Sequence, residues 1–206
     1  MLVEGDTEER FAKELLKPHF EQKGIFIIPR NLKGVGNYKA IHHEIKILLK
    51  DSNAISVTTM LDLYRIPSDF PGFKDLQKDL HFRKKVEKLE ILFAEDIDNS
   101  KFLPYLQLHE FEALLFSDVS HFKKIPNIGN KISEFEKIIS SKEPEEINDL
   151  PNTSPANRIK KIFSFYDKKL HGIIIAKSIG LDKMREKCPH FHSWIESIES
   201  LTSQKL

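Results

Sequence analysis

The chain has 206 residues, of which 40% are hydrophobic and 31% charged, with a net charge of +1. This composition fits a globular protein with one sizeable core, and no apolar run approaches the ~20 residues that a membrane span requires. The single cysteine, Cys188, excludes an internal disulfide, and in the absence of a charged-then-apolar leader we expect a cytoplasmic protein.

Short apolar runs alternate with longer amphipathic runs over residues 1–118, which is typical of a parallel α/β sheet. In chain order, the pattern predicts a strand at 2–4, a helix at 7–22, a strand at 25–28, a helix at 38–50, a strand at 55–61, a helix at 74–95, a strand at 102–108 and a helix at 109–116. Asp6 is the predicted N-cap of the first helix, and Glu9 completes a capping box.

The second part of the chain, residues 119–206, loses this alternation. Residues 140–157 contain three prolines and many polar residues, which indicates a loop, and Ser154 before a proline predicts the start of a helix. The Ile-rich run at 172–180 suits a strand or a packed helix, and we favour the helix. A closing amphipathic helix begins at Pro189. We therefore expect an α/β core at 1–118 and a helical C-terminal subdomain at 119–206.

Carboxylates follow three of the four predicted strands. Glu4 ends the first strand, Asp62 ends the third, and Glu110 and Glu112 follow the fourth; Glu8 lies one helical turn beyond Glu4. The carboxyl ends of parallel strands form the ligand-binding edge of such a sheet. Mg²⁺ prefers a few carboxylates together with phosphate oxygens, so this pattern predicts a metal-dependent phosphoryl-transfer site.

A plainer interpretation explains part of this pattern. Carboxylates in the first turn of any helix are favoured by the helix dipole, at ~0.3–1 kcal/mol each. This accounts for Glu8, Glu110 and Glu112 without a metal. It does not account for Glu4 and Asp62, because each ends an apolar strand, where an unpaired buried charge is costly.

These residues also carry a resemblance. The acid–glycine turn after the first strand, the acid one turn later and the aspartate that ends the third strand resemble the Toprim domain of topoisomerases, bacterial primases and overcoming-lysogenization-defect nucleases. More closely, the chain is similar to a bacterial family catalogued only as a domain of unknown function, regarded as Toprim-like and often encoded beside an AAA/ABC-type ATPase. The segments that carry this similarity are VEGDTEERFAKELLKPHF, TTMLDLYRIPSDFPG, PYLQLHEFEALLFSD and CPHFHSWIESI.

The resemblance implies a function for each matching position. Glu4 would be a metal ligand or general acid/base, Glu8 would be the second acid of the nucleases, and Asp62 would be the first acid of the Toprim Asp-x-Asp pair. The chain departs from the pattern at Tyr64, where the second aspartate is expected. This departure weakens a two-metal mechanism.

The missing carboxylate could come from Asp69, Glu110 or Glu112. We favour Glu112 and Glu110, since the fourth strand is expected beside the third. The predicted metal ligands for Mg²⁺ or Mn²⁺ are thus Glu4, Glu8, Asp62 and Glu110. The predicted catalytic residues are Glu4, Asp62 and Glu112.

Basic residues gather in the second part of the chain. Residues 158–187 hold nine Lys/Arg and three acids, an excess of six positive charges. We expect Arg158, Lys160 and Lys161 to contact a nucleic-acid backbone. The simpler alternative is a solvated helix face.

Two functions from different classes follow from these observations. The first is a Mg²⁺-dependent nuclease acting on DNA or RNA, which the resemblance suggests is the effector of an ATPase-coupled bacterial defence against phage. The second is a non-catalytic Toprim-like binding subunit of an ATPase complex, which Tyr64 favours. A primase-like nucleotidyl transferase ranks last, because no template-handling domain is visible in the sequence.

Overall fold

A parallel sheet forms the centre of the computed structural model, which describes residues 1–75, 81–126, 128–148 and 152–205. Its strands are β1 (Leu2–Val3), β2 (Arg30–Asn31), β3 (Val57–Asp62), β4 (Phe102–Leu103) and β5 (Leu106–Gln107). The order is β2-β1-β3-β4, with β5 also paired to β3, and every pairing is parallel. The predicted α/β class and the adjacency of the third and fourth strands are confirmed.

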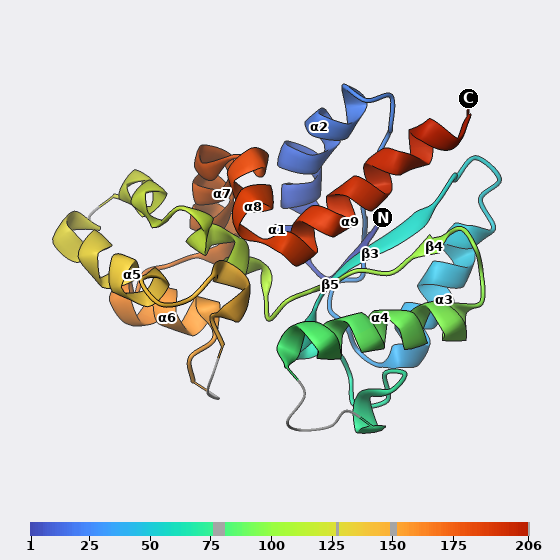
Figure 1. Cartoon of the computed structure of the whole chain (residues 1–206), viewed down its shortest axis with the longest axis horizontal. Helices are drawn as coiled ribbons and strands as arrows, with labels where there is room; N and C mark the ends of the chain where they lie inside the picture. The colour runs from blue at the N-terminus through green and yellow to red at the C-terminus, as the bar shows by residue number, and fades with distance from the viewer. Residues whose placement is uncertain (76–80, 127, 149–151, 206) are drawn as a thin grey trace.

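Helices cover both faces of this sheet (Figure 1). Helices α3 (Tyr38–Leu49) and α4 (Phe82–Ile97) lie on one face, while α1 (Asp6–Phe11), α2 (Lys17–Glu21) and α9 (Pro189–Glu199) lie on the other. Alternate strand residues point to opposite faces. Leu2 and Leu61 accordingly join one buried cluster, and Val3 and Met60 join the other.

The first helix runs from Asp6 to Glu21 through a π-helical turn at Ala12–Leu16. Pro18 has no N–H to donate and its ring crowds the preceding turn, and a widened turn relieves that crowding. The predicted capping box is wrong. The N-cap is Gly5 without a side-chain cap, because Asp6 and Glu9 both accept hydrogen bonds from Asn31 instead.

Several strand and helix boundaries differ from the prediction. The second strand pairs after Pro29 rather than before it, where Arg30 N donates to Met1 O at 2.8 Å. The fourth strand is split by Pro104. In the predicted helix at 74–95, the described part becomes α-helical only at Phe82, and residues 76–80 lie outside the described residues.

The segment after β5 is a 3-10 helix, η4 (Phe111–Ser117), and not an α-helix. All seven of its residues are buried. A segment surrounded on every side has no amphipathic face, so the pattern that usually indicates an α-helix does not apply to it.

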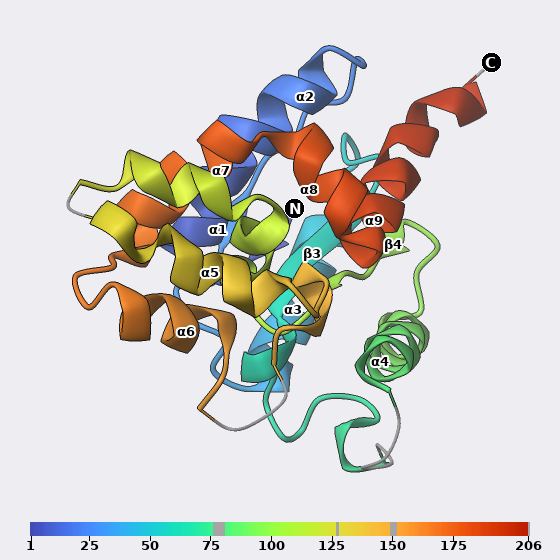
Figure 2. The same cartoon turned by 60° about the vertical axis from the view of Figure 1, so that its left-hand side comes forward.

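The C-terminal part is mainly helical, as expected, and gathers beside α1 (Figure 2). It contains α5 (Ile132–Ile139), α6 (Pro155–Ile162), α7 (Ile173–Ile179) and α8 (Leu181–Lys187). The helix at 172–180 and the N-cap at Ser154, which accepts from Asn157 N at 3.4 Å, are confirmed.

Helix α9 returns from this part to the sheet. Trp194 Nε1 donates to Thr58 Oγ1 at 2.8 Å, and the Trp194 ring stacks on Tyr105 with centroids 4.1 Å apart. One buried cluster accordingly contains residues from both sides of position 118, so the boundary between 118 and 119 stays a prediction. No helix among the described residues is long and apolar enough to cross a membrane.

Candidate functional site

Four of the predicted carboxylates converge at the carboxyl-end edge of the sheet. Glu4 follows β1, Glu8 lies in the first turns of α1, Asp62 ends β3, and Glu112 belongs to η4. All four are buried. We refer to these four residues as the acid cluster.

Backbone groups fix two members of the acid cluster. Asp62 N donates to Glu4 Oε2 at 3.2 Å, and Phe111 N donates to Asp62 Oδ1 at 3.0 Å. Nearby, Tyr64 N donates to His109 O at 3.0 Å and ties the end of β3 to the end of β5. The site is therefore built on the ends of strands, which are rigid positions for functional groups.

A lysine that the sequence did not single out lies among these acids. Lys168 Nζ is 3.0 Å from Glu8 Oε1, 3.3 Å from Glu112 Oε2 and 3.4 Å from Asp62 Oδ2. A second cation, Arg65, stands further out, with Nε 3.9 Å from Glu4 Oε1. The excess of acids among buried strand ends was the signal that a counter-cation was needed, but Lys168 lies 106 residues from Asp62.

The turn that carries Lys168 is packed tightly against the cluster. It is a π-helical turn, η8 (Lys168–Gly172), in which Asp167 accepts from Leu170 N at 2.8 Å. A Cβ at Gly172 would lie 2.9 Å from Tyr166 Oη, so a residue without a side chain fits there. Tyr166 Oη in turn lies 3.5 Å from Glu112 Oε1.

The acid cluster holds more negative charge than its cations balance. Burial, helped by the neighbouring Glu8 charge, raises the pKa of Glu4. Burial also raises the pKa of Glu112, and that of Asp62 well above its usual range, against the opposing pull of Lys168. Burial alone would lower the pKa of Lys168, yet the facing carboxylates raise it overall. The cluster therefore favours an added positive charge or a proton.

The donor set suits a hard divalent cation. Carboxylate oxygens are the ligands that Mg²⁺ and Mn²⁺ prefer, and Glu8 Oε1 and Glu112 Oε2 are buried with the Lys168 ion pairs as their polar contacts. As the side chains stand, however, no three His, Cys, Asp or Glu residues within the described ranges are placed to hold a metal ion. The Lys168 ammonium lies between three of the four carboxylates.

Two other candidates, and the position of the missing aspartate, lie outside the acid cluster. Glu110 Oε1 accepts from Ala156 N at 2.9 Å at the start of α6, and Asp69 accepts from Tyr38 N at 3.2 Å. Tyr64, at the position of the missing aspartate, is exposed. Of the two acids favoured for the missing carboxylate, Glu112 lies in the cluster and Glu110 does not.

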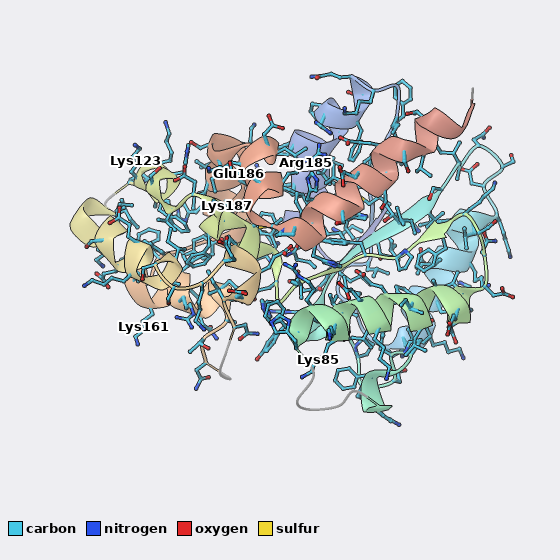
Figure 3. The ribbon with its side chains drawn as sticks, viewed as in Figure 1. Lys85, Lys123, Lys161, Arg185, Glu186 and Lys187 are labelled. Carbon is cyan, nitrogen blue, oxygen red and sulfur yellow. The ribbon has the colours of Figure 1, made fainter. Side chains whose placement is uncertain are left out.

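The predicted nucleic-acid contacts all belong to α6. Lys160 and Lys161 are exposed, and Figure 3 shows Lys161 on the outer side of α6, away from the sheet. Arg158 Nε donates to Thr153 O at 2.7 Å. The structure does not place these three residues in contact with the acid cluster, although Glu110 links the start of α6 to it.

Two cavities beside the sheet lie away from the acid cluster, as does a third one near Arg185 and His192. One of about 320 Å³ is lined by Tyr105, His190 and Trp194, and another of about 390 Å³ is lined by Phe26 and Ile28 near the amino ends of the strands. Neither is lined by a residue of the acid cluster. The functional interpretation therefore depends on the acids and not on these cavities.

Comparisons with curated proteins and with solved structures found no match. A family model described as a domain of unknown function, DUF4276, matches residues 3–199 and so includes the whole acid cluster and Lys168. The chain belongs to the DUF4276 family.

Proposed function

We propose that the protein is a divalent-cation-dependent nuclease and that the acid cluster is its active site. The observation that carries this proposal is the gathering of four buried carboxylates, three of which contact the half-buried Lys168 ammonium. A buried excess of like charge is costly unless it serves a ligand. A positively charged ligand that brings phosphate to carboxylates is a hard divalent cation.

The residues of the cluster divide the work of binding and positioning. Glu8, Asp62 and Glu112 would hold the cation, and Glu4 is oriented by its hydrogen bond from Asp62 N. A bound Mg²⁺ or Mn²⁺ would supply Lewis-acid stabilisation of the phosphate and activate a water. Lys168 would withdraw from the carboxylates while η8 keeps its ammonium close enough to offset charge on the phosphate.

The wider setting of this activity rests on the resemblance to Toprim-like proteins. In this proposal the nuclease works in the cytoplasm with a partner AAA/ABC-type ATPase, as an effector of defence against phage. Copurification of such an ATPase with the full chain tests the partnership separately from the chemistry.

One observation favours the second candidate, a non-catalytic binding subunit. Lys168 closes the acid cluster with contacts at 3.0–3.4 Å, as a purely structural ion-pair network would. Tyr64, in place of a carboxylate, points the same way. In that case the cluster stabilises the junction of β1, β3 and η8 and binds no cation.

A cleavage assay separates the two candidates. Wild type, Glu4→Ala and Asp62→Asn are incubated with DNA and RNA panels in Mg²⁺, Mn²⁺ or EDTA. We expect divalent-dependent cleavage by wild type and by the control Glu196→Gln, whose acid is exposed on α9. Both cluster variants should lose it while keeping a folded circular dichroism spectrum. Equal activity of wild type and the cluster variants would refute the nuclease.

A further inference from the structure

We propose that the substrate is a single-stranded nucleic acid whose bases stack on Tyr64 and Phe165 beside the acid cluster. This inference rests on the proposed function and adds the substrate class and two residues that recognise it. It comes from two exposed aromatic rings whose backbones are anchored next to the site.

The two rings are unusually exposed for large aromatic side chains. Phe165 is 83% exposed and Tyr64 is 56% exposed. Rings of this size usually contribute a large buried area to a core, so leaving them in solvent forgoes that stabilisation. Buried residues lie close on both sides of each ring in the sequence: Phe163 and Tyr166 around Phe165, and Asp62 and Ile66 around Tyr64. The Phe163 ring lies edge-on to Phe165 with centroids 6.4 Å apart. The backbone is thus held while the ring faces outward.

Both rings stand close to the acid cluster. Tyr64 follows Asp62 by two residues, so their Cα atoms are at most about 7 Å apart. Phe165 precedes Lys168 by three residues, and its neighbour Tyr166 lies 3.5 Å from Glu112. A base stacked on either ring would therefore bring its backbone phosphates to the edge of the cluster.

Positive charge flanks this edge from several elements. Arg65 and Lys33 are exposed shortly after β3 and β2, and Lys169 is exposed at the start of η8. Two of these cations have acidic partners, because Lys169 pairs with Asp6 and Arg65 Nε lies 3.9 Å from Glu4 Oε1. Lys33 is exposed, and the Arg65 side chain stays 67% exposed despite its contact with Glu4, so both can meet the phosphates of a nucleic-acid backbone. This charge complementarity favours a nucleic acid as the ligand.

Helix α4 adds cations where a helix normally prefers acids. Its first turn holds Arg83, Lys84 and Lys85 and no acid, against the preference of the helix dipole, and Arg83 pairs with Glu145 at 3.4 Å. Figure 3 shows Lys85 on α4 and Lys161 on α6, and these two helices lie on either side of the end of β3 in both views of the ribbon. A strand that crosses the acid cluster would pass between basic segments.

The exposed rings of Tyr64 and Phe165 favour a single-stranded nucleic acid over a duplex. In a duplex the bases stack on one another and present no free face to a protein ring. An unpaired base can stack on an aromatic side chain, a contact worth ~1–3 kcal/mol per base. Exposed rings beside exposed cations therefore favour a single strand, whereas cations alone would serve a duplex equally well.

The test measures binding without cleavage. Fluorescence anisotropy in EDTA follows fluorescein-labelled, unstructured single-stranded DNA, the same sequence as RNA, and the matching DNA duplex. The proteins are the full-length wild type, Tyr64→Ala, Phe165→Ala, the conservative Tyr64→Phe and Phe165→Tyr, and the control Phe26→Ala. Phe26 is 75% exposed and lies near the amino ends of the strands, away from the acid cluster.

We expect each alanine variant to bind single strands about 5- to 100-fold more weakly than wild type, with duplex binding unchanged. The conservative variants and Phe26→Ala should bind like wild type, and the DNA and RNA arms identify the source of the strand. The inference is overturned if the alanine variants bind single strands as tightly as wild type, if they lose duplex binding equally, or if wild type binds no single strand.

The same proteins distinguish this inference from the proposed function. Asp62→Asn should keep ring-dependent binding while losing divalent-dependent cleavage. If wild type shows ring-dependent binding but no cleavage with any cation, the nuclease fails and the binding site stands. If wild type cleaves and the ring variants bind normally, the nuclease stands and the stacking site fails.

Discussion

At the residue scale, the charge balance of the acid cluster depends on Lys168. Its ammonium contacts three buried carboxylates from three different elements. Removing one partner of a buried ionic group usually costs ~3–5 kcal/mol, because the remaining charges are left without compensation. A nuclease and a structural ion-pair network make opposite predictions for what a divalent cation then does.

Lys168→Met keeps the length of the side chain and removes its charge. In EDTA we expect a loss of about 2–4 kcal/mol in the free energy of unfolding, somewhat below the fully buried figure because the Lys168 side chain is 31% exposed. Mn²⁺ should restore much of that loss and should bind the variant more tightly than wild type. Urea unfolding with and without Mn²⁺ measures both effects. A variant as stable as wild type, with no response to Mn²⁺, would contradict the cation site.

Glu112→Gln tests the raised acid pKa values. Burial raises the pKa of Glu112 in the folded state, so its ionisation destabilises the fold as pH rises from the unfolded value of about 4 through the raised folded value. We expect wild type and variant to be similar in stability below about pH 4, where Glu112 is protonated in both states, and the variant to gain stability relative to wild type as the pH rises to 8 in EDTA. Thermal unfolding against pH measures this, and a constant difference across the range would show that Glu112 does not titrate there.

The acids of the cluster were predictable from the sequence because each follows a strand or opens a helix. Glu4, Glu8, Asp62 and Glu112 converge as expected. Glu110 does not join them, because its carboxylate serves the start of α6. Lys168 was missed because nothing local distinguishes it from the other basic residues between 158 and 187.

At the scale of elements, the accuracy of prediction followed the strength of the local pattern. Helix α3 has a clear amphipathic face and the N-cap Asn37, and its predicted bounds hold to within one residue. The α-helix predicted at 109–116 was wrong, because the segment η4 is buried on every side and has no amphipathic face. The second strand lies later in the chain than the predicted 25–28. Pro29 has no N–H to donate to a neighbouring strand, so pairing begins only at Arg30.

The turn η8 offers a prediction at this scale. In Gly172→Ala the new Cβ would lie 2.9 Å from Tyr166 Oη and 3.3 Å from Phe111 Cε1. We expect a loss of about 1–3 kcal/mol in stability from this overpacking, together with weaker ordering of Lys168 against the acids. Gly180→Ala separates the two sources of cost, because its new Cβ meets no atom within 4 Å while its φ of +82° strains any side chain. Equal unfolding midpoints for Gly172→Ala and wild type would show that the turn is not tightly packed.

At the scale of the whole molecule, the C-terminal part completes the site that the sheet begins. The sheet supplies Glu4 and Asp62, while η8, more than 100 residues later, supplies the cation. Such long-range contacts set the electrostatics of the site, and they cannot be read from residue spacing. The class of fold followed from alternating patterns, but the charge balance of the site required the folded chain.

The most direct test of the cation site is a titration of Mn²⁺ into the full-length protein at pH 8, followed by calorimetry and by electron paramagnetic resonance. We predict that wild type binds Mn²⁺ at a single site, that Lys168→Met binds it more tightly, and that Asp62→Asn loses measurable binding while remaining folded. If neither wild type nor Lys168→Met binds Mn²⁺, the acid cluster is a structural ion-pair network and the nuclease proposal is wrong.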